Sequence, residues 1–238
     1  MAFTKILCIL AATLGLHAAS TSPNPPLRES EKTIAPTKLE FILGSYQLRF
    51  MLTAFYWLLA MAETAATVAP LASSSIWAQR ILSIVAVGGD QSKVHLSPTP
   101  TLALGAILIA CGAVLRLQCY WALGSQFTFE TGILKDHKLV TMGPYAFVRH
   151  PSYAGAFLAY AGLMLYYGSP GSWVMECLVK GSTAGMLFGG GYAFLMFLVV
   201  LGLTWRIPKE DEGLRRKFGE EWDAYAAAVR YAIVPRVW

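Results

Sequence analysis

Long apolar segments separated by polar loops dominate the pattern of this chain. A membrane-spanning helix needs about 20 mostly apolar residues. Five segments approach that requirement: roughly 3–20, 50–71, 101–124, 153–168 and 183–204. A further apolar run, residues 76–87, is too short to span and is expected to form an interfacial or re-entrant helix. The pattern predicts an all-α integral membrane protein with about five transmembrane helices.

The tail after the fifth segment has a different pattern. Apolar residues recur at intervals of four, four and three, and basic residues cover the other side, which is typical of an amphipathic helix. The apolar positions are Leu214, Phe218, Trp222 and Tyr225. Pro208 and the acidic residues that follow it favour a helix start near Glu210. We therefore expect a C-terminal cytosolic amphipathic helix at the membrane surface.

Composition supports the membrane class and narrows the function classes. Hydrophobic residues make up 55% of the chain and charged residues 14%, whereas soluble domains carry about 25% charged residues. The net charge of +5 favours contact with anionic lipid headgroups over nucleic-acid binding. The four cysteines form no CxxC pair, so we expect buried thiols rather than a disulfide framework or a metal site.

Basic residues predict the orientation of the spans. With five spans and a non-cytosolic N-terminus, 14 of the 19 Lys and Arg residues fall on the cytosolic side. The first segment also has features of a cleaved signal peptide, but the charge count favours a retained span. The loop 125–150 and the tail from Arg206 are separated by a two-span hairpin closed by the turn 168–172. They must therefore lie on the same face of the membrane.

Two charges interrupt apolar segments, and such charges are functional candidates because burying them in lipid is costly. For Glu63 a structural or interfacial role is favoured, whereas for Arg116 a functional and a structural role remain equally open. Each could also lie near a headgroup or pair with the other. The small residues in the stretch 181–191 have the spacing of closely packed helices in lipid.

Two polar motifs flank the last two spans. They read HKLVTMGPYAFVRHPSYAG (137–155) and RIPKEDEGLRRKFGEEWDAY (206–225). Together they resemble the isoprenylcysteine carboxyl methyltransferase family, whose wider group includes membrane phospholipid methyltransferases. The resemblance begins near Arg116, so we divide the chain into N-terminal spans without a motif (1–100) and a methyltransferase core (101–238). One departure is Asp211, where the family has a second glutamate.

The resemblance implies a pocket for S-adenosylmethionine. The positions that match its lining are His137, Lys138, Leu139, Val140, Tyr145, His150, Pro151, Ser152 and Tyr153, with Glu130 as a looser match. Glu210 matches an acid that binds the cofactor, and Arg206 matches the arginine that holds the substrate carboxylate. Arg206 and Glu210 are therefore the expected catalytic residues.

The implied reaction is methylation of the C-terminal carboxylate of an S-prenylated cysteine. Such a carboxylate, with a pKa of about 3.3–3.7, is already ionised at neutral pH, so the site needs orientation rather than a base. The implied partners are a prenylated protein or a small prenylcysteine-like substrate together with membrane lipid, and the implied location is the endoplasmic reticulum membrane with the site facing the cytosol. Alternatives are a phospholipid or other lipid-amine N-methyltransferase, a membrane sterol reductase and a non-catalytic scaffold.

Overall fold

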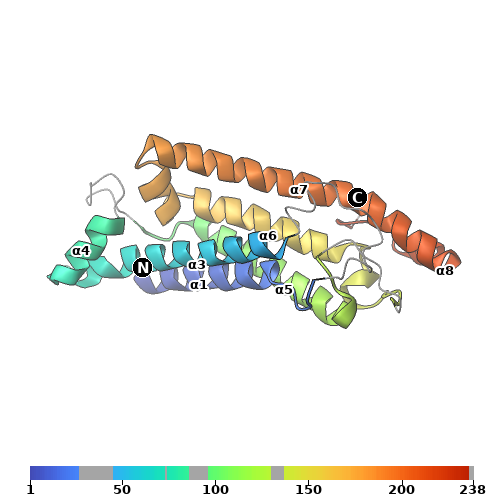
Figure 1. Cartoon of the computed structure of the whole chain (residues 1–238). Coiled ribbons are helices and arrows are strands. Elements are labelled where there is room, and N and C mark those ends of the chain that lie inside the picture. Colours follow the sequence, from blue (N-terminus) through green and yellow to red (C-terminus); the bar gives the residue numbers. More distant parts are fainter. Residues whose placement is uncertain (27–44, 73, 86–95, 130–136, 236–238) are drawn as a thin grey trace. The chain divides into compact units, whose positions relative to one another are not determined.

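The regular elements of the structure are all helical in the part of the chain that it describes (Figure 1). This computed structural model describes residues 1–26, 45–72, 74–85, 96–129 and 137–235. The elements in chain order are α1 (Ala2–Ser20), α3 (Tyr46–Val68), η2 (Ala69–Ala72), α4 (Ile76–Val85), α5 (Pro100–Leu123), η4 (Gly124–Gln126), η5 (Gly143–Ala146), α6 (Pro151–Gly168), the π-helix η6 (Val174–Val179), α7 (Thr183–Phe218) and α8 (Glu220–Ala228). The predicted all-α class is confirmed.

Four of the described helices are long and apolar enough to cross a membrane. They are α1, α3 continued by η2, α5 continued by η4, and α7. The fourth predicted span corresponds to α6, which has 18 residues and begins with the polar sequence PSY. The prediction of about five transmembrane helices is therefore confirmed in outline, with α6 as the one predicted span that is not among those four. The short run near residue 80 forms α4.

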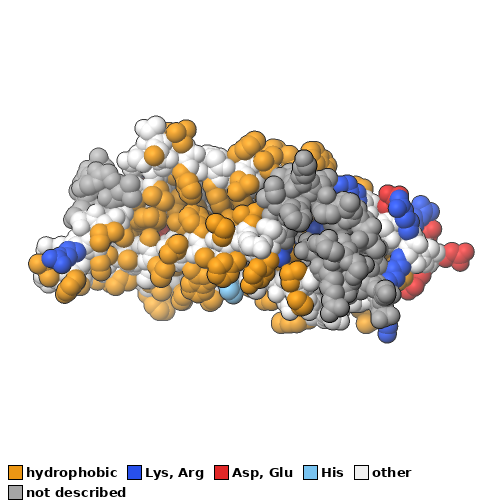
Figure 2. Space-filling view, viewed as in Figure 1, with side chains coloured by type: hydrophobic (Ala, Val, Ile, Leu, Met, Phe, Trp, Pro, Cys, Tyr) orange, Lys and Arg blue, Asp and Glu red, His pale blue; other side chains and the backbone are white. Residues whose placement is uncertain are grey.

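Exposed hydrophobic side chains spread over the helices on the face shown in Figure 2. Charged side chains gather instead around α8 and the end of α7. All four cysteines are free thiols, and three of them are buried. The outer surface of the helices is therefore apolar where lipid would contact it.

Contacts divide the chain into two compact units. Unit 1 comprises Met1–His17, Thr53–Cys111 and Leu158–Phe197, and unit 2 comprises Ala18–Leu52, Gly112–Phe157 and Leu198–Trp238. Both sequence motifs belong to unit 2. The division near residue 100, which was drawn from motif content, stays a prediction.

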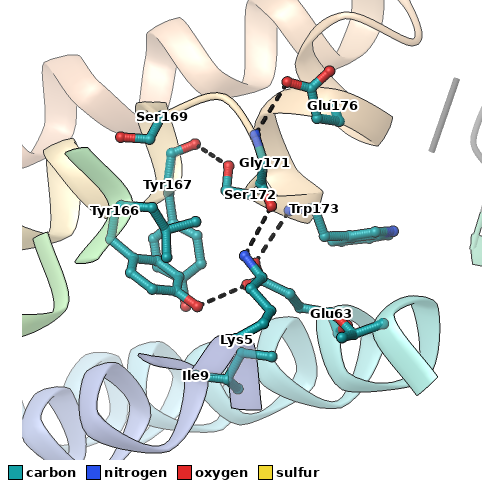
Figure 3. Close-up of polar contacts among 12 residues, drawn as sticks. Lys5, Ile9, Glu63, Tyr166, Tyr167, Ser169, Gly171, Ser172, Trp173 and Glu176 are labelled. Atoms are coloured by element: carbon teal, nitrogen blue, oxygen red, sulfur yellow. Dashed lines mark hydrogen bonds and ion pairs between the residues drawn. The ribbon is translucent and has the colours of Figure 1, made fainter. Parts of the chain in front are cut away.

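A buried ion pair joins Lys5 and Glu63 in unit 1 and has further polar contacts around it (Figure 3). Their side chains are 0% and 1% exposed. Lys5 Nζ also donates to the carbonyl of Gly171 at 2.8 Å. Glu63 accepts from the Tyr166 hydroxyl and from the Trp173 backbone N–H, each at 3.3 Å. The pair joins α1, α3 and the turn after α6, so Glu63 has the structural role that the sequence favoured.

The predicted start of the tail helix is wrong. No new helix begins near Glu210, because α7 continues through Pro208 and ends at Phe218. A proline inside a helix removes one hydrogen bond and kinks the helix without necessarily ending it. The break falls at Gly219, whose φ of 56° is a conformation that other residues rarely adopt. The 36 residues of α7 extend about 54 Å against roughly 30 Å of hydrocarbon, so the charged part from Arg206 onward lies outside the span.

Candidate active site

The two motifs meet in unit 2, although the residues in contact are 57 to 62 positions apart. His150 Nε2 lies 2.7 Å from Asp211 Oδ1, and Arg149 Nη2 donates to Asp211 Oδ2 at 3.1 Å. The Tyr153 hydroxyl donates to Glu210 Oε2 at 2.6 Å. The start of α6 therefore contacts the charged part of α7, which agrees with the predicted placement of both motifs on one face of the membrane.

Arg206 and Glu210 both approach the same tyrosine. The guanidinium carbon of Arg206 lies 6.0 Å from the centroid of the Tyr153 ring, while Glu210 accepts from the hydroxyl of that ring. Arg206 also donates from Nη1 to the carbonyl of Phe129 at 2.6 Å, which fixes the guanidinium. Residues at i and i+4 lie on one helical face, so α7 presents a cation and an anion side by side to Tyr153.

The segment 229–232 after α8 holds the RHP sequence in place. The backbone N–H groups of Arg149 and His150 donate to the carbonyls of Tyr231 at 3.0 Å and Ala232 at 2.7 Å. The Arg149 side chain donates from Nη1 to two further carbonyls of this segment at 3.1 and 2.6 Å. Sequence reasoning missed this segment because its contacts are made by backbone atoms, which no residue type identifies.

Arg116 on α5 fixes the beginning of α6. It is 5% exposed, and its Nη1 donates to the carbonyl and the hydroxyl of Ser152 at 3.1 Å each, while Nε donates to Tyr120 at 3.0 Å. A Cβ atom on Gly155 would lie 2.8 Å from both the Gly112 carbonyl oxygen and Arg116 Cγ. The glycine that ends the first motif is therefore needed for the close approach of α5 and α6.

His137 lies close enough to Glu210 and Lys217 for their charges to act on its ring. Its ring centroid is 6.0 Å from that of Phe218, and its buried Nδ1 has no hydrogen-bond partner in the described part of the chain. Burial lowers the pKa of His137, the charge of Lys217 lowers it further, and Glu210 opposes this shift. These influences favour the neutral form of His137, whose Nδ1 is a buried polar atom without a partner in the described residues.

The remaining predicted pocket residues differ in burial and in the residues they contact. Leu139 packs against the buried cluster of Trp222, Tyr225 and Val229. The predicted apolar face of the tail therefore packs against protein, with Trp222 and Tyr225 buried and Leu214 and Phe218 partly buried. Tyr145 and Val140 belong to a second apolar cluster. Lys138 is exposed, Pro151 is buried, and Glu130 lies outside the described residues.

Asp211 contacts residues of the candidate site, and the sequence left its role open. Burial raises the pKa of its carboxyl, but the hydrogen bonds and charges of His150 and Arg149 together bring that pKa below its ordinary value. Asp211 is therefore an ionised acceptor at neutral pH. The signal that could have identified Arg149 and Asp211 is that each is a charged residue next to a predicted site residue.

Known proteins show similarity to this chain in the region of the two motifs. Residues 100–188 match the family model described as phospholipid methyltransferase. The chain is 32% identical over 130 residues to a probable protein-S-isoprenylcysteine O-methyltransferase of Oryza sativa subsp. indica, and 33% identical over 129 residues to protein-S-isoprenylcysteine O-methyltransferase B of Arabidopsis thaliana. The resemblance to membrane methyltransferases is confirmed. These alignments cover 53% and 52% of this chain, and the chain spans about half the length of both relatives, 57% and 55%.

The sterol reductase alternative also has a counterpart among known proteins. The chain is 26% identical over 161 residues to the delta(14)-sterol reductase of Neurospora crassa, which covers 58% of this chain and 33% of that protein. The identity to the sterol reductase is lower than the identity to the two methyltransferases, and the alignment covers a smaller share of the reductase. The methyltransferases are therefore the better guide to the site.

Proposed function

We propose that this protein transfers a methyl group from S-adenosylmethionine to the C-terminal carboxylate of an S-prenylated cysteine at the membrane surface. The observation that carries the proposal is the contact of Arg206 and Glu210, one helical turn apart, with Tyr153 of the first motif. A cation for the substrate carboxylate thus lies next to an anion for the cofactor. The names of the relatives support the prenylcysteine substrate.

The residues present fit the proposed cofactor, which carries a carboxylate, an ammonium and several hydroxyl groups. Glu210 accepts one hydrogen bond on Oε2, and a carboxylate offers about four acceptor positions, so it retains capacity for an ammonium or hydroxyl group. His137 presents the buried Nδ1 atom that has no partner among the described residues. We propose that these two residues, with His150 and Tyr153, hold the cofactor.

The reaction needs orientation more than proton transfer. S-adenosylmethionine, when bound, supplies a methyl group on a positively charged sulfur. The nucleophile is the substrate carboxylate, which is ionised at neutral pH, so no side chain has to remove a proton. Arg206 orients this carboxylate through its planar fork of donors. Its bond to Phe129 uses one of the five N–H donors of a guanidinium.

The membrane helices suit a substrate with a long apolar tail. A prenyl chain favours the bilayer by about 0.8 kcal/mol for each buried CH₂ group, so the substrate reaches the site along the membrane. The charged end of α7 and the first motif then meet its polar end. The concentration of basic residues near these segments favours a cytosolic orientation, and we propose the endoplasmic reticulum as the membrane.

A lipid-amine N-methyltransferase is the second candidate, favoured by the description of the family model. An amine is protonated at neutral pH and must lose a proton before it attacks, so that site would need a base. It would also not favour a guanidinium facing a cationic amine. Arg206 is therefore the residue that separates the two candidates.

A substrate panel tests the proposal directly. Purified full-length protein in detergent is incubated with isotope-labelled S-adenosylmethionine and either N-acetyl-S-farnesylcysteine or phosphatidylethanolamine. We expect methylation of the farnesylcysteine, and a loss of about 100-fold or more in kcat/KM for Arg206→Ala and for Glu210→Ala, because misplaced reactants lose rate steeply.

The chain provides a matched control for this pair. Glu212 and Arg216 are also four residues apart on α7 and form an ion pair, but both side chains are exposed, at 62% and 75%. Their alanine variants should keep near-normal activity. Methylation of phosphatidylethanolamine alone would favour the second candidate, and full activity in both Arg206→Ala and Glu210→Ala would refute the assignment of the site.

A further inference from the structure

Asp211 uses its two carboxylate oxygens to hold two different residues of the RHP sequence. Oδ1 lies 2.7 Å from His150 Nε2, and Oδ2 accepts from Arg149 Nη2 at 3.1 Å. The His150 side chain is 5% exposed and that of Asp211 is 23% exposed, so water competes weakly for these bonds. The sequence alone gave Asp211 no role.

The bond to Asp211 determines which way the His150 ring presents its second nitrogen. An ionised carboxylate only accepts hydrogen bonds, so the hydrogen in this contact belongs to His150 Nε2. The other nitrogen, Nδ1, is then an acceptor in the neutral imidazole. His150 also stacks on Tyr153, with the ring centroids 5.6 Å apart and the planes at 22°, which fixes the plane of the ring.

His150 Nδ1 faces Glu210 at a distance that leaves room for a shared partner. Nδ1 lies 3.9 Å from Glu210 Oε2, which is too long for a direct hydrogen bond. Glu210 Oε2 accepts from the Tyr153 hydroxyl. Two acceptors thus converge on one position, and a ligand with hydrogen-bond donors, such as an ammonium or a hydroxyl group, can bond to both.

Arg149 keeps Asp211 in position. It binds Asp211 through Nη2 and two carbonyls of the segment 229–232 through Nη1. The carboxylate is therefore held by a cation that is itself tied to the backbone. A carboxylate held in this way resists rotation away from His150.

We propose that Asp211 is a positioning residue that orients His150, so that Nδ1 of His150 and the Glu210 carboxylate together accept hydrogen bonds from the ammonium or hydroxyl donors of the methyl-donor cofactor. The inference rests on the proposed function. It adds Asp211 to the site as a residue that acts through His150. Asp211 itself touches neither the substrate nor the cofactor.

A double-mutant cycle on ligand binding tests the inference without measuring catalysis. Isothermal titration calorimetry measures the affinity of the full chain in detergent for S-adenosylhomocysteine, the demethylated product. Asp211→Asn keeps the side-chain volume and should weaken binding about tenfold. In a His150→Ala background the same change should weaken it less than about twofold, because residues that act through each other are not additive.

The outcomes separate the inference from the proposed function. If the unmodified protein does not bind S-adenosylhomocysteine, the proposed function fails. If it binds, but Asp211→Asn has no effect or weakens binding equally in both backgrounds, the positioning role is refuted. Glu212→Gln, which alters the neighbouring exposed acid, should bind normally.

A second measurement is made on the protein with Asp211 in place. Nitrogen-15 NMR of the four histidines reports which ring nitrogen carries hydrogen, and His150→Gln assigns the signal of His150. We expect the hydrogen on Nε2 and none on Nδ1. A hydrogen on Nδ1 would overturn the inference.

Discussion

Replacing Lys5 with methionine tests the buried ion pair of unit 1. The change keeps a long flexible side chain and removes its charge. Among the described residues, Glu63 would then keep the hydrogen bonds from Tyr166 and Trp173, both at 3.3 Å. Its carboxylate, whose side chain is 1% exposed, would lose the cation that compensates it.

The size of the effect follows from this burial. Removing one partner of a fully buried ion pair destabilises a protein by about 3–5 kcal/mol, because the other charge remains buried without compensation. Replacing both partners with apolar residues is often neutral. We therefore expect Lys5→Met to cost about 3–5 kcal/mol, and Lys5→Met combined with Glu63→Leu to recover most of that loss.

Unfolding by titration with sodium dodecyl sulfate, followed by tryptophan fluorescence, measures these free energies. The control is Lys180→Met, which breaks the ion pair with Glu176 in the same unit. The Lys180 side chain is 55% exposed, and exposed pairs contribute only about 0–1 kcal/mol. If Lys5→Met destabilises the protein no more than this control, or if the double variant is less stable than Lys5→Met, the reasoning is wrong.

Two further predictions concern unit 2. Gly155→Ala should destabilise the protein by about 1–3 kcal/mol in thermal or detergent unfolding, because its Cβ would lie 2.8 Å from the Gly112 carbonyl oxygen. The control is Gly168→Ala, which should not destabilise the protein because the space around Gly168 is open. Equal effects of the two variants would contradict this explanation. The lowered pKa of Asp211 means that its pairing stabilises the folded state above the unfolded pKa of about 3.9, and that this stability is lost as the pH falls through the folded value. The difference in Tm between the unmodified protein and Asp211→Asn should therefore be constant from neutral pH to about pH 5 and vanish in stronger acid, and a difference that grows in acid would contradict the assignment.

Sequence patterns predicted the helices and the meeting of the two motifs. Span positions follow from runs of apolar residues, since a helix in lipid has to satisfy its backbone internally. The two-span hairpin then requires both motifs on one face, and the contacts of Tyr153 with Glu210 agree with that requirement. The predicted start of the tail helix was wrong. The sequence shows that Pro208 weakens a helix, but it does not show whether the turns on either side keep the helix continuous, as they do in α7.

The partners of the charged residues were decided by tertiary structure. From the sequence, Glu63 and Arg116 could each lie near a headgroup or pair with the other. In the structure Glu63 binds Lys5, and Arg116 binds Tyr120 and Ser152. Such choices depend on which side chains the helix crossings bring within about 3 Å of each other, a distance that sequence separation does not determine.

The sequence by itself indicated the helical membrane class, the residues of the proposed site and the placement of its two halves on one face of the membrane. The class follows from local composition and the shared face from counting spans, while the proposed site residues follow from the resemblance of the two motifs to a known family. Only the tertiary structure decided that Asp211 holds His150 and that the segment 229–232 supports Arg149. Those contacts join residues about 60 to 80 positions apart. A hydrogen bond forms only at short range and in a favourable direction, and the packing of the whole unit decides which groups meet these requirements.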